Sequence, residues 1–582
     1  MIDEEVTFLN ELNEEQKEVC KSNENIILTA CPGSGKTRTL TYRIAYLCLK
    51  NIPSRKLNIA ITYTNRAADE IKRRLYKINE DIENVWAGTI HQFCLEYIIK
   101  PYSMYCSRLS CGFHIIDEYV QKEYLDEIID RLGIRNQIGY DNPLDFGEVK
   151  QEYIKKLHDN KEIDFNDILN ISYQLLIDNK FIRENISGII NSIHVDEYQD
   201  TNELQYSILS EIVKVNKNIN VLFVGDLDQA IYSGIGGIAK NKIQIEKEFK
   251  IKFIEKKLDG CYRSSQRVID YYKNFQQNEQ DIYSLAENKN DWGTIFFNQS
   301  IHKDELINKI VEIVKLQLEK GVKENEICII APQWYLLYPL GRKIRRLLPN
   351  VNFDAPDITP IKYDPLNLFY NIAILFFTEA GKDTFIRKKC ALTVLNILND
   401  EYKIEVINYI DNLLLLKYVN SFNSIENNGI EYLKQGIKQL FYHLGIDIKE
   451  ETVLKKAYDD FFNKIDDRVK RYGLSCNIND IKNNFREKKG VVINTFHGVK
   501  GEEYRTVIAF GLLYGYIPHW STIINCSKEV CKEETKKILY VVCSRAKENI
   551  FLFAESGRTH RGGEYEVTTE LQEYGYDYDT IE

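Results

Sequence analysis

The chain has 582 residues and a formal net charge of −10, with 44% hydrophobic and 28% charged residues. This length exceeds what one hydrophobic core supports, so we expect several domains. The acidic balance argues against a protein that coats nucleic acid through overall basicity, although it allows a strand held in a local groove. We find neither an apolar run of about 18 residues nor an apolar signal segment, so we expect a cytoplasmic protein without a membrane partner.

The thirteen cysteines are scattered singly along the chain. Cys526, Cys531 and Cys543 come closest to forming a group, but their spacing matches no zinc or iron–sulfur pattern. Reduced thiols of a cytosolic protein are therefore the expectation.

A phosphate-binding turn is predicted near the N-terminus. Residues 25–30 form a short apolar run that indicates a buried parallel strand, and a helical pattern begins after the turn. Gly33 and Gly35 allow backbone N–H groups to converge on phosphates at the start of the helix. Lys36 can reach the β- and γ-phosphates, and the Thr37 hydroxyl can ligate Mg²⁺. ATP and Mg²⁺ are the predicted cofactors, and the predicted nucleotide-binding residues of this segment are Ala30, Cys31, Pro32, Gly33, Ser34, Gly35, Lys36, Thr37 and Arg38.

Two further strand ends carry polar side chains. Residues 189–195 read as a buried strand that leads into Asp196 and Glu197. Asp196 is placed to hold Mg²⁺, and Glu197 can orient or deprotonate the attacking water. Residues 221–224 lead into a turn with Gln229, a candidate sensor of the γ-phosphate. Solvated turn residues are the alternative reading, which the upstream phosphate turn disfavours.

Nine segments in chain order resemble motifs of the superfamily-1 helicases of the UvrD/Rep/PcrA group. The segments are LNEEQKEV (12–19), ACPGSGKTRT (30–39), ITYTNRAADEIKRRL (61–75), GTIHQF (88–93), VDEYQDTN (195–202), VGDLDQAIY (224–232), CYRSSQRVI (261–269), TFHGVKGEEY (495–504) and LYVVCSRAKENI (539–550). This resemblance implies an α/β fold with two RecA-like lobes. It also implies an ATP-dependent helicase or translocase that moves 3′-to-5′ on single-stranded or partly duplex DNA.

The resemblance implies a role in nucleotide binding for each matching position. Gln16 would recognise the adenine, and Tyr262 would stack on it with Arg38 nearby. Glu503 would contact the ribose.

Two arginines would complete the catalytic set. The resemblance implies that Arg263 and Arg545 meet the γ-phosphate and stabilise charge in the transition state. A guanidinium suits this role because its forked donors are fixed in geometry and always charged. Taken alone, either arginine would read as a partner in a surface salt bridge.

The implied DNA track rests on five positions. Tyr63, Thr64, His91, Thr495 and His497 match positions that face DNA in the family, and aromatic faces can stack on bases. Tyr63 also fits a half-buried core position, and the sequence leaves both readings open.

The chain departs from the family pattern after the segment that contains Gln229. Family members carry an aromatic residue and an arginine there, where this chain has Gly234 and Ile235. One base-stacking platform is thus absent or supplied elsewhere, which casts doubt on strong unwinding by this chain alone. Cys31 also replaces a common glycine, and Gly501-Glu502-Glu503-Tyr504 replaces the usual Gly-Leu-Glu-Phe.

The motifs divide the chain into two interrupted lobes. We predict an N-terminal lobe at 1–98 and 164–240, a helical insertion at 99–163, a second lobe at 241–355 and 486–560, a helical insertion at 356–485, and an acidic, solvated tail at 561–582.

Two other functions compete with a free helicase. UvrD-like proteins of this size occur in anti-phage systems of the Gabija type, paired with an OLD-like nuclease. A DNA-sensing ATPase subunit that regulates a partner nuclease is therefore the alternative, and the short second insertion is compatible with it. A nucleotide-dependent scaffold without turnover is disfavoured by the intact lysine, acid, glutamine and arginine set.

Overall fold

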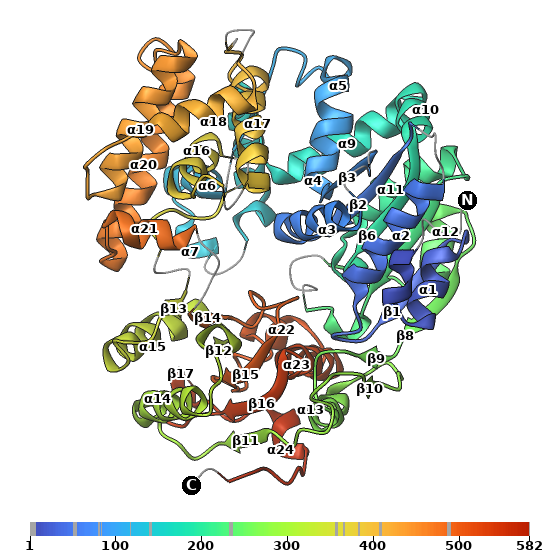
Figure 1. Ribbon diagram of the computed structural model, residues 1–582, viewed down its shortest axis with the longest axis vertical. Helices are drawn as coiled ribbons and strands as arrows, with labels where there is room; N and C mark the ends of the chain where they lie inside the picture. Colours follow the sequence, from blue (N-terminus) through green and yellow to red (C-terminus); the bar gives the residue numbers. More distant parts are fainter. Residues whose placement is uncertain are drawn as a thin grey trace. The chain divides into compact units, whose positions relative to one another are not determined.

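The computed structural model describes residues 7–50, 55–79, 82, 84–116, 118–138, 142–231, 237–355, 359–364, 367–381, 384–404, 406, 410–485, 490–560 and 562–580 (Figure 1). It divides into two compact units, Met1–Gly293 with Ser521–Ser544 and Thr294–Trp520 with Arg545–Glu582. Among the helices of the described ranges, none combines the length and the apolar character needed to cross a membrane.

The first unit is built on a six-stranded sheet with the strand order β3-β2-β6-β7-β1-β8, in which all paired strands are parallel. The strands are β1 (Ile26–Ala30), β2 (Leu57–Thr62), β3 (Val85–Thr89), β6 (Ile190–Asp196), β7 (Asn220–Gly225) and β8 (Ile254–Leu258). Strands of a parallel sheet are covered on both faces, which explains why β1 and β7 read as continuous apolar runs.

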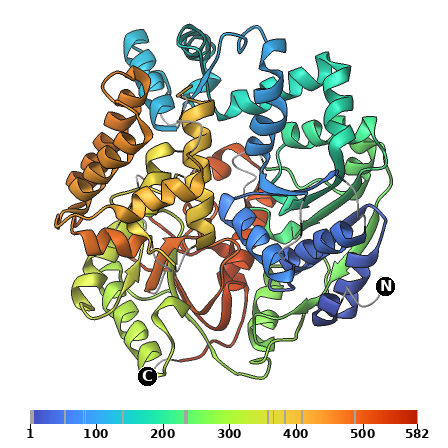
Figure 2. The same ribbon diagram turned by 45° about the horizontal axis from the view of Figure 1, so that its top comes forward.

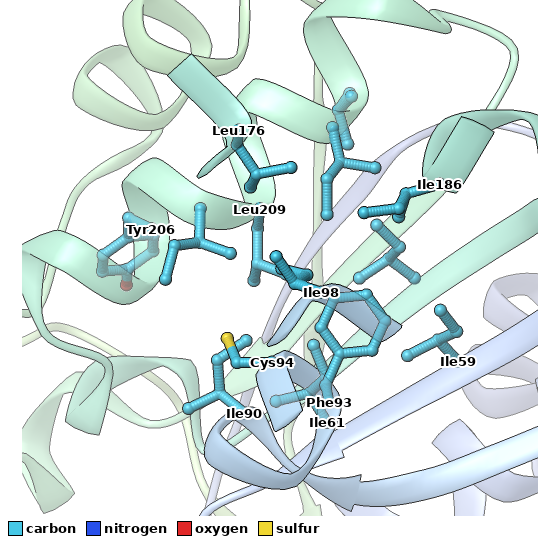
Figure 3. Close-up of a cluster of buried hydrophobic side chains, with 14 of the residues drawn as sticks. Ile59, Ile61, Ile90, Phe93, Cys94, Ile98, Leu176, Ile186, Tyr206 and Leu209 are labelled. Carbon is cyan, nitrogen blue, oxygen red and sulfur yellow. The ribbon is translucent and has the colours of Figure 1, made fainter. Parts of the chain in front are cut away.

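Helices cover both faces of this sheet. On one face, Leu28 of β1 packs with Leu40 of α2 (Lys36–Lys50) and Ile71 of α3 (Asn65–Ile78). On the other face, Ile59 and Ile61 of β2 lie in a larger cluster. Figure 3 shows this cluster with side chains from the following elements: α4 (Ile90–Phe93), the π-helix Cys94–Ile99, α9 (Phe165–Asp178), α10 (Lys180–Ile189) and α11 (Glu203–Val215). Alternate strand residues thus serve two separate cores.

The predicted insertion at 99–163 is mainly helical and has a small core of its own around Ile128 and Tyr153. Its elements are α5 (Lys100–Tyr102), β4 (His114–Ile115), α6 (Glu118–Leu132), α7 (Arg135–Ile138), α8 (Gly147–Asp159) and β5 (Glu162–Ile163), with β4 and β5 paired in parallel.

The first unit continues beyond residue 240, where the sequence analysis placed its end. After α12 (Lys242–Phe249), β8 pairs with β1 in the first sheet. The same unit contains β9 (Gly260–Cys261), α13 (Gln266–Tyr272), β10 (Tyr283–Ser284) and α23 (Lys528–Cys543). The prediction missed this extension because β8 reads as polar (IEKKL) and forms an edge of the sheet.

The second unit contains another six-stranded parallel sheet, with the order β11-β16-β15-β12-β14-β13. The strands are β11 (Thr294–Asn298), β12 (Ile327–Ala331), β13 (Phe353–Asp354), β14 (Val491–Thr495), β15 (Tyr504–Ala509) and β16 (Ala546–Phe553), accompanied by α14 (Lys303–Glu319) and α15 (Trp334–Leu347). The predicted α/β class with parallel sheets is thereby confirmed.

A helical region follows α15 in the chain and appears in yellow and orange in Figure 2. It consists of α16 (Leu368–Phe377), α17 (Thr384–Asp400), α18 (Asn412–Ser421), α19 (Gly429–Leu444), α20 (Thr452–Tyr472) and α21 (Ile478–Asn484). These helices share one core that includes Phe369, Phe441 and Phe462.

The C-terminal segment after α24 (Thr569–Glu573) is not the free solvated tail that the sequence suggested. Asp579 N donates a hydrogen bond of 2.9 Å to Ile295 O of the edge strand β11, and Ile295 N donates one of 2.7 Å to Asp579 Oδ2. The Tyr578 ring also packs against Phe297, with 5.3 Å between ring centroids. The segment thus covers backbone groups that an edge strand leaves open.

Candidate nucleotide-binding site

The glycine turn between β1 and α2 requires glycine at two positions. Gly33 has φ +75° and Gly35 has φ +81°, both in the left-handed region. A Cβ on Gly33 would lie 2.6 Å from Arg263 Cβ, and a Cβ on Gly35 would lie 2.9 Å from Gln16 Nε2. The turn is therefore packed closely against the segments that carry Arg263 and Gln16.

Gln16 is held against this turn by a capping box at the start of α1 (Glu14–Lys21). Asn13 Oδ1 accepts from Gln16 N at 2.8 Å, and Asn13 N donates to Gln16 Oε1 at 3.2 Å. The Gln16 amide donates to Ser34 O at 3.0 Å. The local sequence N-x-x-Q thus orients the side chain that the resemblance assigned to adenine recognition.

The predicted acidic pair lies at the carboxyl end of β6, next to the first residues of α2. The Thr37 hydroxyl donates to Asp196 Oδ2 at 3.2 Å, and Lys36 Nζ lies 3.5 Å from Glu197 Oε1. Glu197 has φ 52°, a left-handed conformation that costs free energy for a residue with a side chain. The two acids of the prediction and the two residues that end the glycine turn are therefore direct neighbours.

These residues fit a magnesium ion. Burial, together with the charge of Glu197, raises the pKa of Asp196 to about 7, and a nearby cation would reverse that shift. Hydroxyl and carboxylate oxygens are the ligands that Mg²⁺ prefers, usually one or two from the protein with the rest from phosphates and water. Among the described residues, no three His, Cys, Asp or Glu side chains are grouped so that they could hold a metal ion by themselves.

Gln229 ends the short helix Leu227–Gln229 at the tip of β7. Its Nε2 donates to Asp226 Oδ2 at 2.6 Å, and both side chains are buried. Burial raises the pKa of Asp226. The altered positions Gly234 and Ile235 lie outside the described residues, so the stacking platform discussed above is not described.

Tyr262 and Arg263 follow β9 and belong to the first unit. Tyr262 N donates to Gly33 O at 2.8 Å, and the Tyr262 hydroxyl accepts from Asn13 Nδ2 at 3.0 Å. The Tyr262 side chain is 44% exposed, so its ring is accessible to a base. Arg263 Nη1 donates to Ser544 O at 2.9 Å.

Arg38 is engaged on the surface next to the glycine turn. Its Nη2 lies 2.9 Å from Glu11 Oε2, and its guanidinium lies 5.4 Å from the centre of the Tyr42 ring. A contact with a nucleotide would require Arg38 to exchange this exposed ion pair, which contributes little to stability.

The remaining predicted nucleotide contacts lie in the second unit. Arg545 is almost fully buried, and its Nη1 donates to Glu502 O at 3.4 Å. Glu503 Oε1 pairs with Lys547 Nζ at 3.0 Å. Both positions flank the pairing of β15 and β16.

The predicted DNA contacts are divided between the units. In the first unit, Tyr63 follows β2 and is 43% exposed, while Thr64 caps α3 by accepting from Ala67 N at 3.2 Å. His91 follows the neighbouring strand β3, and burial lowers its pKa to about 4, so its ring is neutral near pH 7. Thr495 ends β14 in the second unit, and His497 lies in the turn that follows, where Gly498 N donates to Thr495 Oγ1 at 3.1 Å.

Three polar residues of this site were not predicted from the sequence. Asn13 could have been found from its capping box, because that signal is local. Asp226 and Tyr540 gave no such signal, since they are 314 positions apart and meet only in the folded unit.

The sequence is similar to those of known proteins. The UvrD/REP helicase N-terminal domain matches residues 12–144 and 134–250, and the UvrD-like helicase C-terminal domain matches residues 476–557. The chain is 24% identical over 634 aligned positions to the ATP-dependent DNA helicase PcrA of Staphylococcus aureus, covering 95% of this chain and 84% of the relative. It is 25% identical over 632 positions to PcrA of Leuconostoc citreum, covering 94% and 82%.

The glycine turn, the acidic pair and the buried glutamine on a parallel sheet define an ATP-hydrolysing enzyme of the P-loop class. With the two domain matches and the PcrA relatives, the chain belongs to the UvrD/Rep/PcrA-type superfamily-1 helicases and is an ATP-hydrolysing DNA helicase. This confirms the family resemblance.

Proposed function

We propose that the chain is an ATP-driven translocase that moves 3′-to-5′ along single-stranded DNA. The arrangement of Lys36 and Thr37 against Glu197 and Asp196 carries this proposal, because it brings the residues expected to bind phosphate next to a carboxylate suited to orient the attacking water. The relatives named above as ATP-dependent DNA helicases support DNA as the track.

Each of five residues would have a distinct task in hydrolysis. Lys36 would neutralise the β- and γ-phosphates, and Glu197 would orient the water and accept its proton. Gln229 would exchange its bond to Asp226 for one to the γ-phosphate, which lets it report on the state of the nucleotide. Arg263 and Arg545 would balance the charge that develops during transfer.

Thr37 and Asp196 would hold Mg²⁺. When bound, the ion supplies positive charge to the phosphate oxygens as the bond to the γ-phosphate breaks. Ser34 and Gln229, on the chain's own side of the site, are buried.

Gln16, Tyr262 and Arg38 of the first unit would contact the adenine, and the family resemblance assigns Glu503 to the ribose. Gln16 lies on the turn through Ser34, and the Tyr262 ring is accessible to a purine face. Aromatic stacking tolerates any base, so selectivity for adenine would come from the Gln16 amide.

The DNA would contact the carboxyl ends of the strands, where ligands of open α/β sheets bind. Tyr63 would stack on a base. Thr64, His91, Thr495 and His497 would contribute hydrogen bonds rather than charge, and for His91 this follows from its lowered pKa.

The decisive experiment measures ATP hydrolysis with and without single-stranded DNA for wild type, Lys36→Ala and Lys50→Ala. Lys50 ends the same helix and is exposed, which makes it a matched control. We expect strong stimulation by DNA in wild type and Lys50→Ala, and turnover about a thousandfold lower in Lys36→Ala. Equal turnover in all three proteins would contradict the assigned site.

Direction is tested by displacement of streptavidin from oligonucleotides biotinylated at one end. A 3′-to-5′ motor displaces streptavidin from the 5′ end faster than from the 3′ end. The opposite preference would contradict the polarity. DNA-stimulated hydrolysis without displacement at either end would instead favour the alternative of a DNA-sensing subunit that regulates a partner nuclease.

A further inference from the structure

Helix α23 of the first unit carries a buried tyrosine that reaches the loop of Gln229. Tyr540 is fully buried, and its hydroxyl lies 3.5 Å from Asp226 Oδ2. The same carboxylate oxygen accepts from Gln229 Nε2 at 2.6 Å. Asp226 therefore links the γ-phosphate sensor of the proposed site to α23.

The C-terminal end of α23 is also tied to Arg263. Arg263 Nη1 donates to Ser544 O at 2.9 Å, and Arg545 is the next residue in the chain. Tyr540 lies about one helical turn before Ser544. The last turn of α23 thus touches Asp226 on one side and Arg263 on the other.

A second connection holds α23 when the tyrosine hydroxyl is removed. Asp228 Oδ1 accepts from Gln277 N at 3.0 Å, and Gln277 Nε2 donates to Glu533 O of α23 at 2.7 Å. The fold of the unit does not depend on the Tyr540 hydroxyl alone, so its loss should affect the orientation of Asp226 more than the packing of the helix.

The chemistry of Asp226 explains why a hydroxyl is needed there. The Asp226 side chain is only 3% exposed, and a buried carboxylate is stabilised by each donor that points at it. When Gln229 turns to a phosphate, Asp226 Oδ2 loses its closest donor and keeps the Tyr540 hydroxyl, while Asp228 N still donates to Asp226 Oδ1 at 3.0 Å. Phenylalanine would fill the same space without supplying a donor.

We propose that Tyr540 is a positioning residue for ATP hydrolysis, which holds Asp226 in place while Gln229 exchanges its hydrogen bond, and keeps the end of α23 in register with that movement. This inference rests on the ATP site proposed above. Tyr540 acts through Asp226 and is not itself placed in contact with ATP.

The neighbouring Tyr272 provides a matched control. It is fully buried like Tyr540, and the two rings meet edge to face with centroids 5.2 Å apart. The Tyr272 hydroxyl has no hydrogen-bond partner within the described residues. Tyr272→Phe and Tyr540→Phe therefore remove the same atom from the same cluster, and only the second removes a donor to Asp226.

The test compares kcat and KM for ATP, at saturating single-stranded DNA, among wild type, Tyr540→Phe and Tyr272→Phe. We expect kcat to fall about tenfold in Tyr540→Phe, the effect of one hydrogen bond to a charged group, with KM within about twofold of wild type. Tyr272→Phe should match wild type in both constants, and all three proteins should melt at similar temperatures.

Combining Tyr540→Phe with Gln229→Ala tests whether Tyr540 acts through Asp226 and Gln229. In Gln229→Ala the exchange of hydrogen bonds is absent, so adding Tyr540→Phe should lower kcat by less than about twofold further. Equal loss of kcat in Tyr272→Phe and Tyr540→Phe, or an undiminished effect of Tyr540→Phe in Gln229→Ala, would overturn the inference. If wild type turned over ATP but Tyr540→Phe matched it, the inference alone would fail; a wild type without turnover would overturn the proposed site as well.

Discussion

The two units contain the same kind of sheet but differ in the charges at its carboxyl edge. In the first unit, Asp196 and Asp226 are buried at the tips of β6 and β7, and burial raises both pKa values. In the second unit, the buried carboxylate of Glu555 after β16 accepts from Gly511 N at 2.9 Å and pairs with Arg558. The carboxyl edge of the first sheet thus has buried acids that a bound cation would stabilise. At the carboxyl edge of the second sheet, Arg558 of the same unit already balances the charge of Glu555.

This difference shows how one architecture carries two tasks. Buried groups with raised pKa values cost folding free energy and recover it when a ligand binds, which is typical of functional sites. A buried acid that is saturated by an arginine and a backbone N–H contributes to the fold instead. The comparison predicts that substitutions at the first edge change chemistry, while substitutions at the second edge change stability.

The largest expected effect comes from Glu197→Gln. The amide keeps the size of the side chain but cannot accept a proton, so we expect kcat for ATP to fall about a thousandfold. ATP binding, measured with a fluorescent nucleotide, should remain within about threefold of wild type because Lys36 and the turn are unchanged. A Glu197→Gln protein that hydrolyses ATP normally would refute the assignment of Glu197 as the base.

Gly33→Ala tests the close packing of the glycine turn. The new Cβ would meet Arg263 Cβ at 2.6 Å, so we expect a loss of about 3 kcal/mol in stability and at least about tenfold weaker ATP binding. Gly112 also has positive φ, +87°, but nothing lies within 4 Å of its Cβ position. Gly112→Ala should therefore cost only about 1 kcal/mol, from backbone strain, and leave ATP binding unchanged. Similar ATP affinities in the two variants would show that the contact with Arg263 is unimportant.

Glu555→Gln tests the second edge. The substitution removes the negative charge that pairs with Arg558 and accepts a hydrogen bond from Gly511 N. We expect the free energy of unfolding to fall by about 2 kcal/mol. Urea denaturation followed by fluorescence measures this loss. ATP affinity should stay at the wild-type value, and a marked drop in affinity would contradict the division of roles between the two edges.

The last expected effect, similar in size to that of Glu555→Gln, is a dependence on pH from His194 in β6. Burial, and then the charge of Arg43, lower the pKa of this side chain from 6.5 to about 3. Below pH 6.5 this histidine is protonated in the unfolded chain but stays neutral in the folded chain. The free energy of unfolding therefore falls as the pH decreases below 6.5, by about 1.4 kcal/mol per pH unit.

The measurement compares wild type with His194→Gln at pH 7 and pH 5. The free energy of unfolding of wild type should fall by about 2 kcal/mol more than that of the variant between pH 7 and pH 5, because wild type alone carries His194. Hydrogen exchange should place the loss in β2 and β6 of the first sheet rather than in β12 and β15 of the second. Equal losses in the two proteins would show that His194 is protonated in the folded state.

Much of the site could be predicted because its signals are local. A strand, a glycine turn and a helix in succession predict where Lys36 and Thr37 lie, and Asp196 and Glu197 come at the end of a strand that is mostly buried. The acidic pair meets the turn because carboxyl ends of parallel strands share one edge of a sheet. The extent of the first unit was less predictable, since β8 is a polar edge strand whose sequence does not indicate burial.

The sequence by itself determined the class of chemistry, because phosphate binding and water activation depend on short motifs whose residues are near one another in the chain. Only the tertiary structure decided that Arg263 packs against Gly33, that Tyr540 reaches Asp226, and that Asp579 pairs with β11. These contacts join residues separated by more than 200 positions. No local spacing encodes them, since they arise from how helices and edge strands pack once the sheets have formed.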